Sequence, residues 1–287
     1  MTAAALRKAL PPPVKRALKV LAGWAYSSRR WLKAGRPRAG ASGPGTAAPA
    51  HTRTGTADAG HLSASNEHGS YCVPRSSSHR PVAQAILDSR VWEPDTLDLL
   101  RAADSDGDIV HAGTFFGDFL PALARSRTGG AVIWAFEPNV ENHDCAQRTI
   151  ALNELPNVHL ARAGLDVGAG AAQLATADRA GVPLGGASRV IKDAARARWF
   201  SNEDIELVSV DATVGADRRV AAIHLDVEGH EQTALTGALA TIERCRPLIV
   251  LETLPEASWL AENVEPLGYR VEARVDLNYV LRAGSRG

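Results

Sequence analysis

Residues 108–118, DIVHAGTFFGD, join an apolar run to a turn that carries Gly113 and Gly117. We expect a buried strand over Asp108–His111, a G-x-x-x-G turn and then a helix over Asp118–Ser126. Gly113 permits a tight turn, Gly117 lets the backbone approach a ligand, and the helix start offers unpaired N–H groups. The turn is therefore a candidate ligand-binding loop, although its glycine spacing alone is weakly specific.

The next expected strand ends at Phe136-Glu137-Pro138, and Glu137 lies 24 residues after Gly113. A carboxylate at that strand end is placed to accept hydrogen bonds from two ribose hydroxyls. Glu137 could also be a solvent-exposed loop charge or the cap of the following helix. The glycine turn before it favours the ribose role.

Apolar runs and helical segments alternate through the rest of the chain, and three of the runs are continuous, as in strands buried on both faces of a parallel sheet. This alternation predicts an α/β fold with a Rossmann-like, doubly wound, mostly parallel sheet of seven strands. No helix fits between the last two strands, so we expect an antiparallel C-terminal hairpin at one edge. The expected strands are Asp108–His111, Ala131–Phe136, Val158–Ala161, Ala221–Leu225, Leu248–Leu251, Tyr269–Val275 and Tyr279–Arg282. The expected helices are Asp118–Ser126, Val140–Glu154, His230–Glu243 and Glu256–Leu267, the last followed by Gly268, with two short helices around Glu93-Pro94.

A second polar cluster follows the fourth of these strands, in the segment HLDVEGHE at residues 224–231. In open α/β sheets, ligands bind beyond the carboxyl ends of the strands. Three carboxylates and two imidazoles within eight residues exceed what packing needs at that edge, and Glu252 ends the following strand. The cluster is therefore a candidate reaction site.

Four segments in order, GTFFGDF, WAFEPN, LDVEGHE and RPLIVLE, resemble the FkbM family of methyltransferases. The resemblance covers residues 71–287, and LDVEGHE followed by Gly237-Ala238 is its most specific part. It implies a class I methyltransferase that binds S-adenosyl-L-methionine and methylates a hydroxyl on a sugar or another secondary metabolite. It also implies that residues 113–117 line the methionine end of the cofactor, that Glu137 holds the ribose and that residues 163–166 lie near the adenine. The expected cofactor-binding residues are His111, Gly113, Thr114, Phe115, Phe116, Gly117, Asp118, Glu137, Pro138, Asp166 and Asp226.

Methyl transfer to a hydroxyl requires alignment and a general base. His230 is the first candidate because its ordinary pKa suits neutral pH, and Asp226 is the second because it lies nearest the strand end. Glu228 completes the expected catalytic set. Each has an alternative interpretation, since Asp226 could only cap the following helix, Glu228 could only favour its positive end, and His230 could be a first-turn residue that never meets substrate. These side chains and Glu252 could also bind a metal, but no tight ligand spacing demands one, and we expect none.

One position departs from the family pattern. The family's first strand usually ends in Asp, and this chain has His111 there. A neutral ring nitrogen of His111 could orient the cofactor's amino group, or cofactor binding could be weakened. Two other functions therefore stay open, an NAD-type oxidoreductase, which usually has a tighter G-x-G-x-x-G turn, and a non-catalytic cofactor-binding scaffold protein.

Charge and composition divide the chain near residue 70. Residues 1–57 hold eleven Lys or Arg and no acid, whereas the remainder carries 21 basic and 32 acidic residues. We expect a basic, low-complexity, disordered extension over residues 1–70, of which 35–70 form a linker, and a methyltransferase domain over 71–287, with a cap or lid at 71–105. The extension could touch a membrane surface, nucleic acid or an acidic partner, whereas the acidic body argues against a nucleic-acid-binding main domain.

The cysteines and the hydropathy indicate the cellular compartment in which the protein works. Cys72, Cys145 and Cys245 are odd in number and lack Cys-x-x-Cys spacing, so we expect neither a disulfide framework nor a thiolate zinc site. This cysteine use fits a reducing cytoplasm. No window is apolar enough for a membrane helix, so we expect a cytoplasmic protein without a transmembrane segment.

Overall fold

The computed structural model describes residues 60–191, 198 and 200–284 of one compact unit that spans Gly55–Gly287. The basic extension expected at the start of the chain lies outside the described residues up to residue 59. None of the described helices has both the length and the apolar character needed to cross a membrane.

The described chain begins with a β-hairpin, which corrects the linker expected through residue 70. Strand β1 (His61–Asn66) pairs antiparallel with β2 (Gly69–Pro74), from His61 opposite Pro74 to Asn66 opposite Gly69. Leu62 and Ala64 pack against a hydrophobic cluster that includes Tyr71 and Val73. Composition alone missed this strand because its stability comes from pairing and from this cluster, not from its own apolar content.

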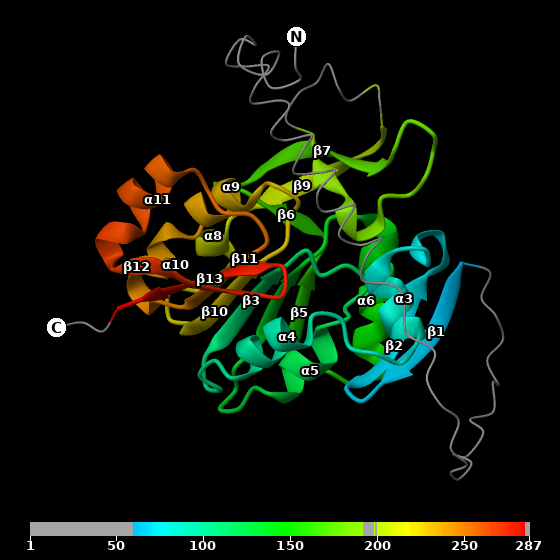
Figure 1. Ribbon diagram of the computed structural model, residues 1–287, viewed down its shortest axis with the longest axis horizontal. Coiled ribbons are helices and arrows are strands. Elements are labelled where there is room, and N and C mark those ends of the chain that lie inside the picture. The colour runs from blue at the N-terminus through cyan, green and yellow to red at the C-terminus, as the bar shows by residue number, and fades with distance from the viewer. Residues whose placement is uncertain (1–59, 192–197, 199, 285–287) are drawn as a thin grey trace, which may run out of the picture. The chain divides into compact units, whose positions relative to one another are not determined.

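The central sheet has seven strands in the order β12-β13-β11-β10-β3-β4-β5 (Figure 1). Neighbours from β11 to β5 pair in parallel, and β13 pairs antiparallel with both β11 and β12. The predicted Rossmann-like fold with its antiparallel edge hairpin is therefore confirmed. The strands are β3 (Asp108–Ala112), β4 (Ile133–Phe136), β5 (Val158–Ala161), β10 (Val220–Leu225), β11 (Leu248–Leu251), β12 (Tyr269–Val275) and β13 (Asn278–Ala283).

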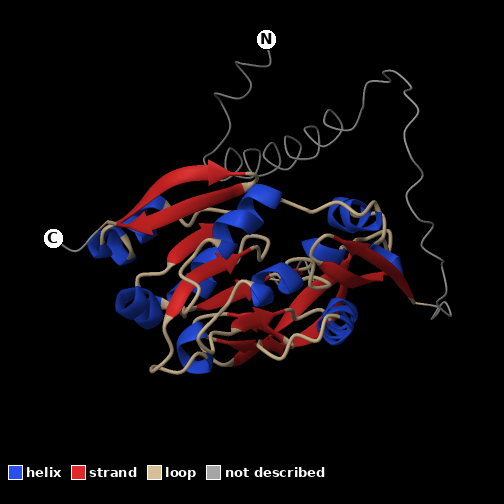
Figure 2. Cartoon of the chain, turned by 90° about the horizontal axis from the view of Figure 1, so that it is seen from below, coloured by secondary structure: helices blue, strands red, loops and turns tan. Residues whose placement is uncertain are grey.

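Helices cover both faces of this sheet (Figure 2). Every residue of β3 and of β11 is buried, as expected for strands with a hydrophobic cluster on each face. Residues of α4 and α5 belong to one of these clusters. Residues of α8, α9 and α10 belong to the other, and residues of α11 pack against it. The helices are α3 (Pro81–Leu87), α4 (Pro94–Arg101), α5 (Leu120–Arg125), α6 (Val140–Leu152), α8 (Val210–Thr213), α9 (Glu231–Thr236), α10 (Leu239–Cys245) and α11 (Ala257–Asn263), with 3-10 helices at Arg75–Ser77, Gly185–Ala187 and Glu265–Leu267.

The helix predicted over His230–Glu243 is two helices, because the chain breaks at Gly237-Ala238 between α9 and α10. A Cβ atom on Gly237 would lie 2.0 Å from the carbonyl oxygen of Asp166, so another segment of backbone touches the chain there. The break therefore serves a close approach between segments. The predicted helix end at Gly268 is confirmed. This glycine is left-handed (φ 86°) and directly follows the 3-10 turn Glu265–Leu267.

A second sheet was not predicted. Its four strands, in the order β6-β9-β7-β8, are β6 (Ala163–Leu165), β7 (Gly170–Ala177), β8 (Arg189–Val190) and β9 (Ser201–Val208). Among the described residues, its small buried cluster consists of Leu174, Ile205 and Leu207. The strands are short or half exposed, so they lack the continuous apolar runs that marked the central sheet.

Candidate active site

The turn after β3 is held against the two neighbouring strands. Gly113 is left-handed (φ 82°), and a Cβ atom there would lie 1.8 Å from the carbonyl oxygen of Asp226, which follows β10. The backbone N–H groups of Gly113 and Thr114 both donate to the carbonyl oxygen of Phe136 at the end of β4, over 3.2 and 3.3 Å. Only glycine fits at residue 113, so the local sequence fixes how closely the three strand ends meet.

The rest of the turn points largely into the protein. Phe115 and Phe116 belong to the hydrophobic cluster beneath the hairpin, and the hydroxyl of Thr114 donates to the His111 carbonyl over 3.2 Å. Phe115 has a positive φ of 50°, which is uncommon for a bulky side chain. Gly117 is left-handed as well (φ 84°), and burial raises the pKa of the Asp118 carboxyl to about 7.

Glu137 lies at the end of β4 and fastens this turn to the start of α6. One carboxylate oxygen accepts from the Phe115 N–H over 2.8 Å and the other from the Asn139 N–H over 2.9 Å. The residue is only 4% exposed, and burial raises its pKa to about 7 against the effect of these hydrogen bonds. A buried carboxylate that reaches across to the glycine turn is not the exposed loop charge considered as an alternative, and the helix cap at this position is the side chain of Asn139 instead.

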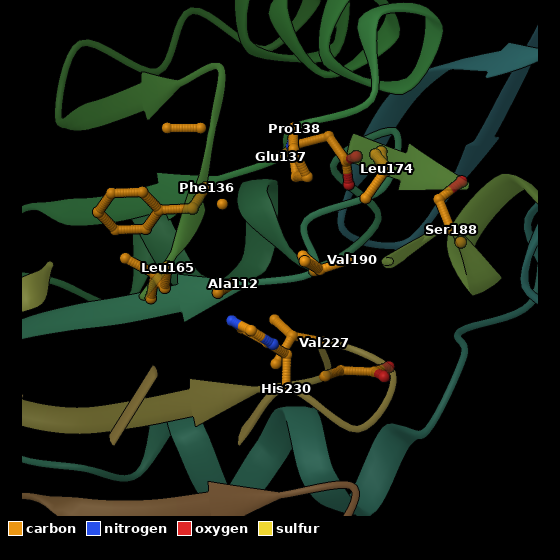
Figure 3. Close-up of a pocket in the computed structure, with 15 residues that line it drawn as sticks. Ala112, Phe136, Glu137, Pro138, Leu165, Leu174, Ser188, Val190, Val227 and His230 are labelled. Carbon is orange, nitrogen blue, oxygen red and sulfur yellow. The ribbon is translucent and has the colours of Figure 1, made fainter. Parts of the chain in front are cut away.

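A pocket opens beside Gly113 and Glu137. In Figure 3, Glu137 and Pro138 lie on one side of it, and Val227 and His230 lie on the other. A third wall comes from the second sheet and the loop within it. The lining residues are Ala112, Gly113, Phe136, Glu137, Pro138, Ala163, Gly164, Leu165, Leu174, Gly186, Ser188, Val190, Asp226, Val227 and His230.

His230 and Asp166, predicted separately as a base and as a residue near the adenine, form a pair. The Nε2 atom of His230 lies 2.7 Å from Oδ2 of Asp166, and the side chain of His230 is 9% exposed. A carboxylate accepts from imidazole N–H, so this contact sets the direction of the ring. The structure thus brings together two residues that are 64 positions apart.

Asp226, Glu228 and Glu252 form a carboxylate cluster beyond the ends of β10 and β11. One oxygen from each can be chosen so that all three lie within 4.8 Å of one another. Burial, together with the charges of Glu252 and Glu228, raises the pKa of Asp226 well above its ordinary value. Burial and the charge of Glu252 also raise the pKa of Glu228, to about 8. The cluster therefore binds protons at a pH at which ordinary carboxyls have lost them.

Further charged side chains of the described residues act on this cluster. Burial raises the pKa of Glu93 to about 7, although Asn278 donates to its carboxylate over 2.6 Å. Arg189 and Arg80 act on Glu228 in the opposite direction. Glu228 is also left-handed (φ 54°) and precedes left-handed Gly229, a strained turn of the kind found at functional sites. Three converging carboxylates suit shared protons or a hard cation, and the expectation that the reaction uses no metal stays a prediction.

His111 is placed outside the pocket, which corrects the expectation that its ring approaches a cofactor. The ring is 3% exposed, with Nδ1 lying 2.9 Å from Nδ1 of His224 and Phe119 stacked on both rings. Burial and the neighbouring His224 lower the pKa of His111, so the pair is held neutral. Side chains alternate along a strand, and the pocket side of β3 carries Ala112, one residue further on.

Several pocket residues were not predicted. Leu174, Gly186, Ser188 and Val190 come from the second sheet and its connections, whose strands carried no clear pattern. Glu93 was recognised only as a helix boundary. Its position before Pro94, at the start of α4, is a signal that points to a turn and not to a site.

The sheet order and the pocket at the carboxyl ends of its strands define a Rossmann-like domain that can hold a nucleotide-like ligand. The sequence profile of the methyltransferase FkbM domain matches residues 110–271. The protein therefore belongs to the FkbM methyltransferase family. A search of curated proteins found no match.

Matches among solved structures include the following three proteins. The methyltransferase FkbM of Methylobacillus flagellatus KT is 17% identical with a TM-score of 0.40, and the match covers 62% of this chain and 43% of that one. A methyltransferase from Geobacter sulfurreducens is 15% identical with a TM-score of 0.39, covering 72% of this chain and 86% of that one. M. jannaschii TYW2, solved in complex with AdoMet, is 10% identical with a TM-score of 0.41, and the match covers 77% of this chain and 83% of that one. The chain thus spans less than half the length of the first of these proteins.

Proposed function

We propose that the protein transfers a methyl group from S-adenosyl-L-methionine to a hydroxyl of a small molecule, a sugar or another secondary metabolite. One observation carries the proposal. The pocket has the glycine turn and Glu137 on one side and Asp226 and His230 on the other, so a cofactor site and proton-accepting groups share one space. Membership of the FkbM family supports the same reaction class.

The residues around the pocket fit this cofactor. Gly113 lines the pocket, and its lack of a Cβ atom lets the turn lie directly against the carbonyl oxygen of Asp226 at the carboxyl end of β10. One oxygen of Glu137 accepts only the Phe115 N–H and keeps a further lone pair for a ribose hydroxyl, whereas the other accepts the Asn139 N–H and, over 3.4 Å, the side-chain amide of Asn142. Leu165, Leu174 and Val190 give the pocket apolar walls that suit an adenine ring. When bound, the cofactor supplies a methyl group already activated by its sulfonium charge.

Asp226 is the residue that best fits the role of general base. It lines the pocket, and its raised pKa makes its ionised form a stronger proton acceptor than an ordinary carboxylate. Asp226 would take the proton of the acceptor hydroxyl as that oxygen receives the methyl group. Glu228 and Glu252 share that proton within the cluster.

His230 is better suited to positioning than to abstraction of the proton. Its Nε2 already donates to Asp166, so the ring is held against the pocket wall beside the base. We propose that this pair shapes the space between the adenosine and the acceptor. The oxidoreductase and scaffold alternatives are not favoured, because the family assignment gives no support to either.

Calorimetric titration of the purified chain with S-adenosylhomocysteine, with NAD as the control ligand, tests the proposed cofactor. We expect micromolar binding of the homocysteine compound and none of NAD. Binding of NAD instead, or of neither compound, would overturn the proposal.

A further inference from the structure

A second group of ligating side chains lies away from the pocket, between the N-terminal hairpin and α6. His61 comes from β1, Cys72 from β2 and Cys145 from α6. One donor atom from each lies within 4.8 Å of the other two, and the two Sγ atoms are 3.6 Å apart. Both cysteines are buried and His61 is half-buried.

The spacing of these atoms matches a particular coordination geometry. Tetrahedral Zn²⁺ binds thiolate at about 2.3 Å, which puts two sulfur ligands about 3.8 Å apart. The observed Sγ–Sγ distance is close to that edge and well beyond the roughly 2.05 Å of a disulfide bond. Two thiolates and an imidazole are also the soft and borderline donors that zinc selects over hard cations such as Mg²⁺.

We propose that His61, Cys72 and Cys145 bind one Zn²⁺ ion that fastens the N-terminal hairpin to the methyltransferase domain. Three residues supply ligands, and a water molecule takes the fourth position. His61 lines a second cavity together with Glu141 and Asp144, so the site has a polar approach for the ion. Binding displaces the two thiol protons to solvent, as thiolate ligation requires.

The site would stiffen the protein behind the glycine turn. The Cys72 N–H donates to the Thr149 hydroxyl over 3.1 Å, and that hydroxyl donates to the Phe116 carbonyl over 2.8 Å. Cys72 and Cys145 share one hydrophobic cluster with Phe115 and Phe116. The ion would therefore hold β2 and α6 together at the place where they support the turn. This role is independent of which acceptor the enzyme methylates.

The sequence pattern concealed this site. Cys72 and Cys145 are 73 residues apart and are joined only when β2 packs on α6. The expectation of no thiolate zinc site rested on the lack of Cys-x-x-Cys spacing, and fold-level contacts can supply ligands that such spacing does not show.

Elemental analysis of the full chain tests the proposal. The protein is expressed in zinc-supplemented medium, purified under reducing conditions without metal-affinity resin, and its zinc content is measured by mass spectrometry. We expect about one zinc ion per chain, lost in Cys72→Ser and Cys145→Ser and weakened in His61→Ala. Cys245→Ser is the matched control, because this third cysteine lies on α10 outside the group, and it should keep its zinc.

Cobalt substitution gives a readout that needs no variant. Apoprotein titrated with Co²⁺ should develop thiolate-to-cobalt charge-transfer absorption and the intense visible bands of tetrahedral cobalt. Zinc-free wild-type protein that also lacks these bands would overturn the proposal, even if the cysteine variants fail to fold. Equal zinc in the wild type and in folded Cys72→Ser and Cys145→Ser proteins would overturn it as well.

Discussion

At the two ends of the central sheet, the pKa values of the carboxyl groups are shifted in opposite directions. At the amino end of β3, Asp108 accepts hydrogen bonds from Val132 N–H at 2.9 Å, Trp134 Nε1 at 2.8 Å and Arg218 at 2.8 and 2.5 Å. Burial alone would raise the pKa of Asp108, but these donors lower it below its ordinary value. At the carboxyl end, burial and neighbouring acids raise the pKa of Asp226 and Glu228.

The difference separates a structural carboxylate from reactive ones. Asp108 is charged, paired and fully hydrogen-bonded, which ties β3 to β4 and to the loop before β10. In the described part of the chain, Arg189 and Arg80 act on Glu228 in this cluster, but burial and like charge still raise its pKa, which costs stability. Strongly perturbed carboxylates beside a pocket are candidates for proton transfer. The contrast predicts that substitutions at the carboxyl end impair binding or chemistry without lowering stability, whereas those at the amino end lower stability.

The largest effect is expected for Asp226→Asn. Loss of the proposed base should lower turnover by about 100-fold or more, with S-adenosylhomocysteine affinity changed only a few-fold. Formation of S-adenosylhomocysteine with a methyl acceptor measures turnover, and calorimetry measures affinity. Asp217→Asn, an exposed acid before β10, is the control and should retain full activity. Wild-type turnover in Asp226→Asn would remove this residue from the mechanism.

Asp108→Asn should change stability and leave the chemistry intact. Removing the charge weakens the hydrogen bonds from Arg218, whose side chain is 33% exposed, and we expect a loss of about 2–3 kcal/mol in the free energy of unfolding. Denaturant unfolding measures this loss. Asp98→Asn is the control, because its ion pair with Arg101 is exposed and should contribute about 0–1 kcal/mol. A drop in turnover per folded Asp108→Asn molecule would contradict the division between the two ends.

Glu137→Gln should weaken cofactor binding. An amide cannot accept on both sides as the carboxylate does, so we expect S-adenosylhomocysteine affinity to fall by about 10-fold or more. Titration calorimetry measures the effect, and Glu141→Gln is the control, since Glu141 is an exposed acid at the start of α6, four residues further along the chain. Unchanged affinity would refute the proposed ribose contact.

The smallest effect concerns pH and stability. The pKa of Glu228 is raised to about 8 in the folded protein, so the native state binds the proton more tightly than the unfolded chain does. Its contribution to stability is therefore present at low pH and lost as the pH rises through about 8. Glu228→Gln should flatten this loss and raise the melting temperature by about 2–4 °C above pH 8 for each kcal/mol recovered. The exposed Glu243→Gln should melt like the wild type at every pH, and a Glu228→Gln profile parallel to the wild type would contradict the assignment.

The central sheet could be predicted from sequence because runs such as Leu248–Leu251 are apolar throughout and carry their own burial signal. Strand β7, GAAQLATA, could not, since Leu174 is its one large buried side chain and its stability comes from pairing with β9. The residues of the candidate site also divide into those that the sequence could predict and those that it could not. Glu137 was predicted because its place at a strand end follows from chain order, whereas the contact of His230 with Asp166 depends on how β6 meets the loop after β10.

Hydrogen–deuterium exchange with and without S-adenosylhomocysteine tests most directly whether function resides at the carboxyl end of the sheet. The account predicts ligand-dependent protection in peptides covering residues 110–118, 134–142 and 225–231, and none in peptides covering 104–108 and 215–220. Protection concentrated around Asp108 and Arg218, with the glycine turn unaffected, would contradict it.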